Sequence, residues 1–181
     1  MVNNNFTFTN MKIVTIVAVD TQMVIGAGNK IPWHAPADLA FFKQKTLHQH
    51  ILMGYQTYAS LPRLLPQRQH IVLTRQNLAN LPQPTAELCF CNGYEAALDI
   101  CAQRQAAELW IIGGGQIYAQ LLPFSEELYI SRIDTKTENP DTFFPAIPAN
   151  FLLTAENKRA ADEKNLYDIN FQLYVNQAVI R

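Results

Sequence analysis

The fold is decided by one stretch of the chain, residues 109–118, which reads Leu109-Trp110-Ile111-Ile112-Gly113-Gly114-Gly115-Gln116-Ile117-Tyr118. It begins with a short apolar run, typical of a strand buried on both faces of a sheet. The three glycines lead into a helical pattern, and the free N–H groups at the start of a helix favour a phosphate. The run does not match G-x-G-x-x-G, so it is not the Rossmann fingerprint. Two interpretations remain open: a turn that holds the pyrophosphate of a dinucleotide, and a tight strand-to-helix connection.

Segments of the same kind recur along the chain. Apolar runs of strand length occur at 13–19, 51–53 and 71–73. Helical patterns bounded by Gly or Pro occur at 36–47, 55–61, 94–104 and 116–122. Strands that alternate with helices predict the α/β class, here a single domain with a mostly parallel, twisted central sheet and helices on both faces.

The last third of the chain changes character. Apolar and polar residues alternate at 128–133 and at 167–173, which predicts antiparallel C-terminal strands with one wetter face. Pro140, Pro145 and Pro148 lie between these segments and disfavour both helix and central strand. We therefore expect a long loop there.

Length and composition favour one globular domain that binds a small molecule. The chain has 181 residues, of which 49% are hydrophobic and 16% charged, enough for a sizeable core. The net charge of −1 provides no basic surface for nucleic acid, and no apolar run reaches the ~18 residues of a membrane span. We expect a monomer without nucleic-acid or membrane partners. Because the chain starts without a signal-peptide pattern, we also expect a cytoplasmic location.

The three cysteines, Cys89, Cys91 and Cys101, carry no evident chemistry. Their odd number does not suggest a disulfide framework, and they lack C-x-x-C spacing and a nearby pair of histidines. We expect buried free thiols and no metal site.

Asp38 is the first candidate for chemistry. It lies within the predicted helix at 36–47, between Phe41 and Phe42 in helical projection, so its carboxylate is directed towards apolar surroundings. A desolvated carboxylate is costly unless a cationic or hydrogen-bond-donating ligand pairs with it, which suggests a group that orients a ring and assists its protonation. The alternative is an acidic residue in a first turn, where it interacts favourably with the helix dipole.

Three further candidates lie in predicted loops. The stretch 26–33 contains two glycines and ends in Trp33, so it is either a loop that closes over a ligand or an ordinary connection with Trp33 in the core. Arg68 is able to form a bidentate pair with the carboxylate of a substrate, although many loop arginines face solvent. Arg75 follows the strand at 71–73, at the edge where open α/β sheets bind ligands, and is placed to meet a phosphate or only water.

Together these motifs resemble bacterial dihydrofolate reductases in order and in spacing, from about Met11 to the end of the chain. The resemblance rests on these segments: Val24-Ile25-Gly26, Ile31-Pro32-Trp33, Pro36 to Lys43, Met53-Gly54 with Thr57, Leu65-Pro66 with Arg68, Ile112 to Gly115 with Tyr118, and Asp141-Thr142 before Phe144-Pro145. Met11 matches the usual start of family members. Residues 1–10 are therefore predicted to be a flexible N-terminal extension, and residues 11–181 the catalytic domain.

The resemblance implies reduction of dihydrofolate to tetrahydrofolate by hydride transfer from NADPH, which supplies one-carbon metabolism. It implies catalytic roles for Asp38, Trp33 and Tyr118. Substrate-binding residues would be Ile16, Val17, Ala18, Asp38, Leu39, Phe42, Leu65, Arg68, Ile112 and Ser131. Cofactor-binding residues would be Ala18, Ile25, Asn29, Ile31, Gly54, Tyr55, Gln56, Thr57, Leu73, Thr74, Arg75, Gly113, Gly114, Gly115, Gln116, Ile117 and Thr142. It also places the family's unusual cis peptide bond at Gly113-Gly114.

The chain departs from the family pattern around the 2′-phosphate of the cofactor. Tyr55 stands where the family commonly has Arg, and Gln56 and Gln116 replace residues that are frequently basic. Arg75 is the candidate that compensates, because one bidentate Arg is a strong phosphate partner. Preference for NADPH over NADH is therefore expected to depend on Arg75.

Two rival functions are consistent with parts of the pattern. A reductase for another pterin-like or flavin-precursor ring would share the glycine turn, but Asp38 together with Arg68 argues against it. A non-catalytic nucleotide-binding or assembly module would retain only the phosphate turn. The combination of Trp33, Asp38, Tyr118 and Thr142 argues against that alternative.

Overall fold

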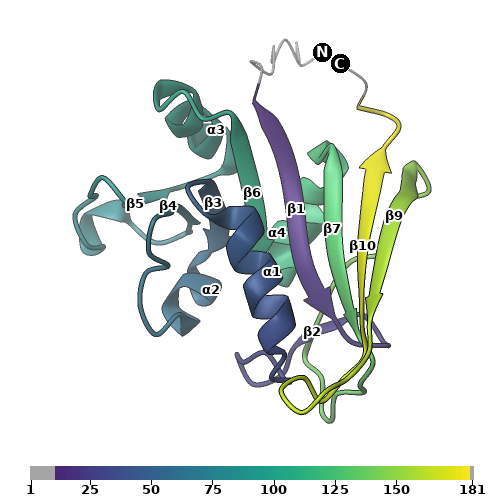
Figure 1. Cartoon of the computed structure of the whole chain (residues 1–181). Coiled ribbons are helices and arrows are strands. Elements are labelled where there is room, and N and C mark those ends of the chain that lie inside the picture. The colour runs from purple at the N-terminus through teal and green to yellow at the C-terminus, as the bar shows by residue number, and fades with distance from the viewer. Residues whose placement is uncertain (1–10, 180–181) are drawn as a thin grey trace.

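The computed structural model describes residues 11–179, so the predicted extension at 1–10 lies outside the described residues. An eight-stranded sheet in the order β5-β4-β3-β6-β1-β7-β10-β9 forms the centre (Figure 1). Its strands are β1 (Lys12–Val19), β3 (His50–Gly54), β4 (Gln69–Leu73), β5 (Leu88–Cys91), β6 (Glu108–Gly113), β7 (Glu127–Ile133), β9 (Phe151–Arg159) and β10 (Ile169–Asn176). Two short strands, β2 (Val24–Gly26) and β8 (Thr142–Phe143), pair separately.

Six neighbouring strands, from β5 to β7, run parallel, and β10 pairs antiparallel with both β7 and β9. The prediction of a mostly parallel sheet that ends in antiparallel strands is confirmed. The segment at 128–133, expected to be antiparallel, is parallel to β1 on one side and antiparallel to β10 on the other. The carboxyl ends of β1, β3, β4 and β6 therefore lie along one edge of the sheet.

Four helices connect the strands. They are α1 (Pro36–Thr46), α2 (Tyr55–Ser60), α3 (Tyr94–Gln103) and α4 (Gly115–Leu121), and two turns of 3-10 helix occur at Leu78–Asn80 and Leu122–Phe124. Pro36 suits the first turn of α1, because its missing N–H has no partner at a helix start. All four helices were predicted within a few residues.

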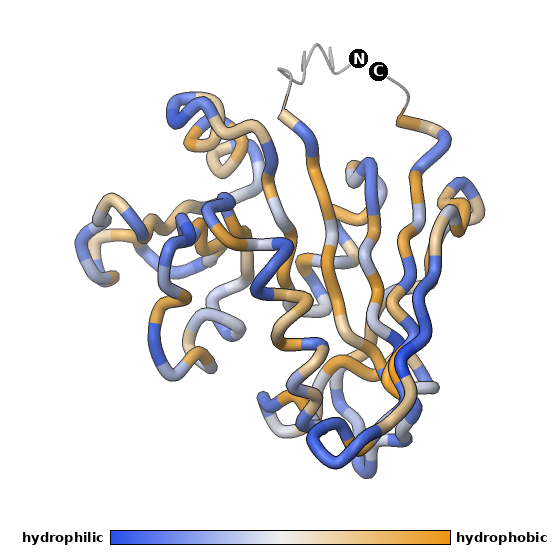
Figure 2. The backbone as a smooth tube through the Cα atoms, viewed as in Figure 1, coloured by the Kyte–Doolittle hydropathy of each residue, from blue (hydrophilic) through white to orange (hydrophobic). Residues whose placement is uncertain are grey.

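The helices cover both faces of the sheet, as predicted. On one face Phe41, Phe42 and Tyr58 of α1 and α2 pack against a cluster that includes Val14 and Ile16. On the other face α3 and α4 pack against a second cluster that includes Ile13, Val17 and Val19. Alternate residues of β1 thus enter opposite cores, which explains its nearly continuous apolar sequence. Figure 2 shows hydrophobic residues along the central strands and a hydrophilic connection between β9 and β10.

The long proline-containing loop after β7 includes one element that was not predicted. Its residues Thr142 and Phe143 form β8 against β2, with Val24 opposite Phe143 and Gly26 opposite Thr142. The pairing joins the loop after β1 to the loop after β7. Within the described residues no helix is long and apolar enough to cross a membrane.

Candidate active site

The predicted site residues gather at the edge where the parallel strands end. Ile16, Val17 and Ala18 lie in the second half of β1, and Ile112 and Gly113 end β6. Gly54 and Leu73 end β3 and β4. Ligands of open α/β sheets bind outside the carboxyl ends of the strands. The topology therefore assembles segments that are far apart in the sequence.

Asp38 lies in the first turn of α1, and Ser131 of β7 faces it from the sheet. Burial raises the pKa of the Asp38 carboxyl, and a hydrogen bond from the Ser131 hydroxyl opposes this shift. Ser131 is itself buried. The sequence left two interpretations of Asp38 open, an acid in a first helical turn and a desolvated carboxylate. In the structure this side chain has both features. Within residues 11–179 this half-buried acid forms no ion pair, and the neutral Ser131 hydroxyl is its hydrogen-bond donor.

Tyr118 joins α4 to β1, within range of the charge of Asp38. Its hydroxyl donates to the Ile16 carbonyl at 2.8 Å. Burial raises its pKa, and the negative charge of Asp38 raises it further, so the phenol keeps its proton. Asp38 and Tyr118 thus belong to one electrostatic environment, on opposite sides of β1.

Arg68 is buried, with 4% of its surface exposed, so it is not a loop arginine that faces solvent. Its guanidinium donates to the Pro66 carbonyl at 2.8 Å, the Lys43 carbonyl at 3.2 Å and the Thr46 hydroxyl at 3.2 Å. All of these partners are neutral, and desolvation lowers the pKa of Arg68. No carboxylate within the described part of the chain forms an ion pair with Arg68, and a guanidinium held in this way is suited to an anionic ligand.

The glycine turn approaches its neighbours so closely that side chains would not fit. Gly113 has φ +133°, and the Gly113-Gly114 peptide bond is cis, where the resemblance placed it. A Cβ added to Gly114 would lie 3.2 Å from the Thr57 hydroxyl, and one added to Gly54 would lie 3.1 Å from Ile117. The turn after β6, the end of β3 and the start of α2 therefore form one backbone-lined surface.

The paired strands β2 and β8 border the same turn. A Cβ on Gly115 would lie 3.1 Å from Thr142 and 3.9 Å from Ile25. Asp141 accepts hydrogen bonds from the Gly28 N–H at 2.6 Å and the Thr142 hydroxyl at 2.7 Å. Both bonds lower the pKa of Asp141, and the bond from Thr142 has the larger effect. The loop predicted to close over a ligand is thus attached to the loop after β7.

The expected phosphate side carries little charge. Arg75 is exposed and donates to the Gln116 side chain at 3.0 Å, which places these two predicted residues together. Gln56 is exposed in the first turn of α2. The ring of Tyr55 instead packs near Tyr58 and Phe90, with centroids 5.8 and 6.4 Å apart, so it belongs to the core on one face of the sheet.

The remaining predicted residues lie around this edge in different environments. Trp33 is 8% exposed and packs with Ala35, Ile133 and Ile169, so it is a core residue at the end of its loop. Ile31 and Leu39, by contrast, are 61% and 52% exposed. The other residues are Phe42 on α1, Leu65 before β4, Thr74 after β4, and Asn29, with φ +58°, in the loop after β2.

Two buried polar residues near these loops, Asp20 and His70, were not predicted from the sequence. Asp20 is fully buried and accepts backbone hydrogen bonds from Gln22, Val24 and Thr137 at 2.8, 2.9 and 2.9 Å. Burial raises its pKa, but these bonds outweigh burial and lower it overall. His70, also fully buried, bonds to the Leu65 amide. Neither residue belongs to a motif, so only the fold reveals its partners.

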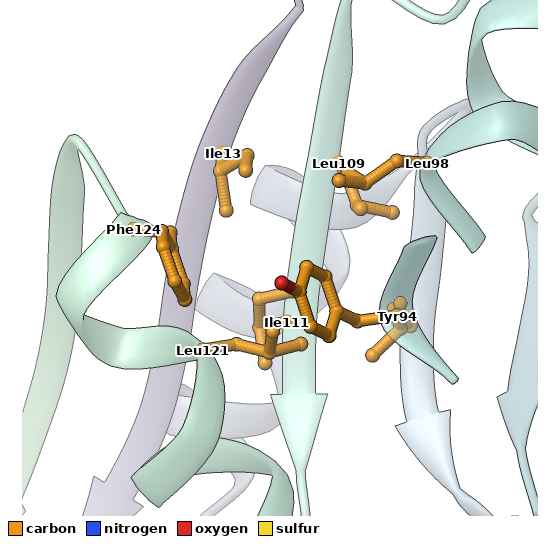
Figure 3. Close-up of a pocket in the computed structure, with 8 residues that line it drawn as sticks. Ile13, Tyr94, Leu98, Leu109, Ile111, Leu121 and Phe124 are labelled. Atoms are coloured by element: carbon orange, nitrogen blue, oxygen red, sulfur yellow. The ribbon is translucent and has the colours of Figure 1, made fainter. Parts of the chain in front are cut away.

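A separate apolar pocket lies on the face of the sheet that α3 and α4 cover (Figure 3). Its lining residues are Ile13, Leu52, Tyr94, Leu98, Leu109, Ile111, Leu121 and Phe124. They carry no charge and belong to the face covered by α3 and α4, whereas Asp38 and Arg68 lie on the side of α1. This pocket is therefore part of the core and not of the candidate site.

No group of side chains suited to a metal occurs among residues 11–179. Cys89, Cys91 and Cys101 are free and buried, as predicted. Burial raises the pKa of both Cys91 and Cys101 to about 12, so these thiols are not reactive nucleophiles.

Comparison with known proteins agrees with this geometry. The dihydrofolate reductase family model matches residues 12–176. The chain is 37% identical to the dihydrofolate reductase of Haemophilus influenzae, over 89% of this chain and 96% of the relative. It is 44% identical to that of Neisseria meningitidis serogroup B, over 81% and 86% of the two chains. The structure of the Enterococcus faecalis dihydrofolate reductase complexed with NADP(H) and RAB-propyl matches with a TM-score of 0.80 and 34% identity, over 92% of this chain and 96% of the other. The chain therefore belongs to the dihydrofolate reductase family.

Proposed function

We propose that this chain reduces dihydrofolate to tetrahydrofolate with NADPH, and that Asp38 is its catalytic carboxylate. The observation that carries the proposal is the half-buried Asp38, whose pKa is raised by burial and which has one hydrogen-bond donor, Ser131. Such a group stabilises a bound ring that presents an amino group and a ring nitrogen. Membership of the family supports the same reaction.

The cofactor fits the backbone-lined surface described above. Close packing at Gly54, Gly114 and Gly115 leaves no room for side chains, and Thr57 and Thr142 border the glycines. Bound NADPH would supply the hydride. The residues proposed to hold it are Ala18, Ile25, Asn29, Ile31, Gly54, Tyr55, Gln56, Thr57, Leu73, Thr74, Arg75, Gly113, Gly114, Gly115, Gln116, Ile117 and Thr142.

The substrate is proposed to lie between α1 and the end of β1. Asp38 accepts hydrogen bonds from the pterin amino group and the adjacent ring nitrogen, which orients the ring and favours its protonation. Arg68 pairs with the glutamate carboxylate, supported by its neutral partners. Ile16, Val17, Ala18, Leu39, Phe42, Leu65, Ile112 and Ser131 line the pocket.

Tyr118 and Trp33 have supporting places in this proposal. The Tyr118 hydroxyl bonds to the Ile16 carbonyl and keeps its proton, so it fixes β1 beside the reacting rings. Trp33 holds the end of the closing loop in the core. We further propose that the domain of residues 11–181 acts as a cytoplasmic monomer, for which light scattering and cell fractionation are the tests.

The decisive experiment follows NADPH absorbance with purified protein and dihydrofolate, and repeats the trace with Asp38→Asn. Loss of absorbance that requires both dihydrofolate and Asp38 is the expected result. A flat trace from folded protein that still binds NADPH would instead favour a binding module or a reductase of another ring.

A further inference from the structure

The buried histidine of β4 occupies a defined position between two backbone groups. The Leu65 N–H donates to His70 Nε2 at 3.0 Å, and His70 Nδ1 lies 3.0 Å from the Glu87 carbonyl. Because Nε2 accepts a hydrogen, the ring proton must be on Nδ1, where it is donated to Glu87. His70 is therefore neutral, in a single tautomer, with both nitrogens in use.

Leu65, which donates to His70, directly precedes Pro66, whose carbonyl contacts the Arg68 guanidinium. We define the tail loop as residues 64–68. The Pro66 carbonyl in this loop accepts from the Arg68 guanidinium at 2.8 Å, and the Gln67 carbonyl accepts from the His48 N–H at 2.8 Å. Gln67 has φ +62°, so the chain turns sharply between these two anchors. His70 holds the start of the loop, and Arg68 lies at its end.

We propose that His70 is a positioning residue for the acidic tail of the substrate: its neutral imidazole fixes Leu65 and Pro66, and thereby the direction of the Arg68 guanidinium. This inference rests on the proposed function, in which Arg68 binds the glutamate carboxylate. It assigns specificity for the tail to a side chain that touches neither the substrate nor the cofactor.

Protonation of His70 would place a second N–H against the Leu65 N–H and remove that bond. Burial lowers the pKa of His70, the Glu87 carboxylate and carbonyl together with the Arg68 carbonyl raise it, and the positive charge of Arg68 lowers it. Burial outweighs the other influences, so the pKa of His70 is lowered from its ordinary value. The ring is therefore neutral at neutral pH, and the tail loop is expected to loosen only in acid.

Two neutral variants separate the bond to Leu65 from burial alone. In His70→Gln the amide oxygen reaches the position of Nε2 and accepts from Leu65, but it does not titrate. In His70→Asn the shorter side chain keeps the position of Nδ1, donates to Glu87 and leaves Leu65 without its partner. Both variants are measured with dihydrofolate and with a dihydropterin that lacks the benzoylglutamate tail, at about pH 7.5 and about pH 5.5.

The expected result is a five- to tenfold higher KM for dihydrofolate in His70→Asn, roughly the effect of one lost hydrogen bond, with kcat and the KM for the tailless substrate unchanged. In the parent, the KM for dihydrofolate should rise in acid, whereas the KM for the tailless substrate should not. His70→Gln should keep the parental KM for dihydrofolate at neutral pH and should not show this rise in acid. A parental KM in folded His70→Asn, or an acid-side rise that persists in His70→Gln, would overturn the inference. A parent protein that reduces neither substrate would instead refute the proposed function.

A two-dimensional NMR spectrum that correlates each backbone amide nitrogen with its proton provides a readout that does not depend on activity. The Leu65 resonance should shift in His70→Asn and remain near its parental position in His70→Gln. An unshifted Leu65 resonance in His70→Asn would also contradict the inference. If His70→Asn does not fold, the acid titration of the Leu65 resonance in parent and His70→Gln decides the question in the same way.

Discussion

The two halves of the candidate site differ in the groups that form them: buried charged side chains in one half, and backbone with small side chains in the other. On the proposed substrate side, Asp38 and Arg68 are withdrawn from water and held by neutral partners. On the proposed cofactor side, glycine backbone and small side chains form the surface, and Arg75, the cation proposed to lie there, is exposed. Charges in a desolvated environment act strongly at short range, whereas an exposed charge is screened. Recognition of the substrate should therefore depend on few residues, and preference between cofactors should be weak and sensitive to salt.

The largest effect is expected at the desolvated acid. Asp38→Asn should reduce kcat/KM for dihydrofolate at neutral pH by about 10²- to 10⁴-fold, because the amide neither carries charge nor favours ring protonation. Activity should recover partly in acid, as the substrate becomes protonated in solution. Steady-state kinetics across pH provide the measurement, and near-parental activity at neutral pH would contradict the role of Asp38.

The same variant is its own control for folding. A carboxyl whose folded pKa is raised binds its proton more tightly in the folded than in the unfolded state, so its stabilising effect is present at low pH and is lost as pH rises past its ordinary value. Asp38→Asn removes this cost and should raise Tm at neutral pH by about 2 °C. A lower Tm would mean that the carboxylate stabilises the unliganded protein.

The next largest effect is expected at Arg68. Arg68→Met should raise the KM for dihydrofolate by about 100-fold, because two charge-assisted hydrogen bonds to the tail are lost, and Arg68→Lys should retain part of the binding. The matched control is a dihydropterin without the tail, whose KM should not change. Equal losses with both substrates would show that Arg68 supports the fold of the pocket and not the tail.

A smaller effect, and a different kind of control, applies on the cofactor side. Arg75→Ala should raise the KM for NADPH by about tenfold and leave that for NADH nearly unchanged, because only NADPH carries the 2′-phosphate. The difference should shrink at high salt. Equal changes with both cofactors would remove Arg75 from the phosphate site.

The smallest expected effect is a gain. Gln56 is exposed in the first turn of α2, so Gln56→Lys adds a charge without removing a packed side chain. We expect a two- to fivefold lower KM for NADPH, the rough scale of one exposed ion pair, and no change with NADH. Titration of both cofactors at low salt provides the measurement, and an unchanged KM for NADPH would mean that position 56 lies beyond reach of the phosphate.

The elements that the sequence predicted correctly carry their signal locally. The helix α1 begins at a proline, and β6 is an apolar run that ends in glycines. The strand β9 was not predicted, because nearly all of its residues are exposed and it is held by backbone pairing with β10. Likewise, β8 has only two residues, and its partner lies in a distant loop.

The candidate site divides in the same way. Asp38, Arg68 and the glycine turn could be singled out as candidates from residue type and spacing. Asp20 and His70 were not, because their partners are backbone amides that only the folded chain brings near. A buried polar residue whose partners are backbone groups leaves no pattern in its own neighbourhood. The core position of Trp33 also remained open, because its partners Ile133 and Ile169 are distant in the sequence.

The position of β1 in the sheet has a consequence for folding during synthesis. This first described strand lies between β6 and β7, with Lys12 opposite Glu108 and Val14 opposite Glu127. The ribosome synthesises β1 long before β6 and β7. The apolar residues of β1 therefore remain without these neighbouring strands during much of synthesis. Chains with such distant pairings fold slowly, and their exposed strands favour aggregation. A nascent chain that stops before Glu108 should therefore bind chaperones, and release should require the emergence of β7.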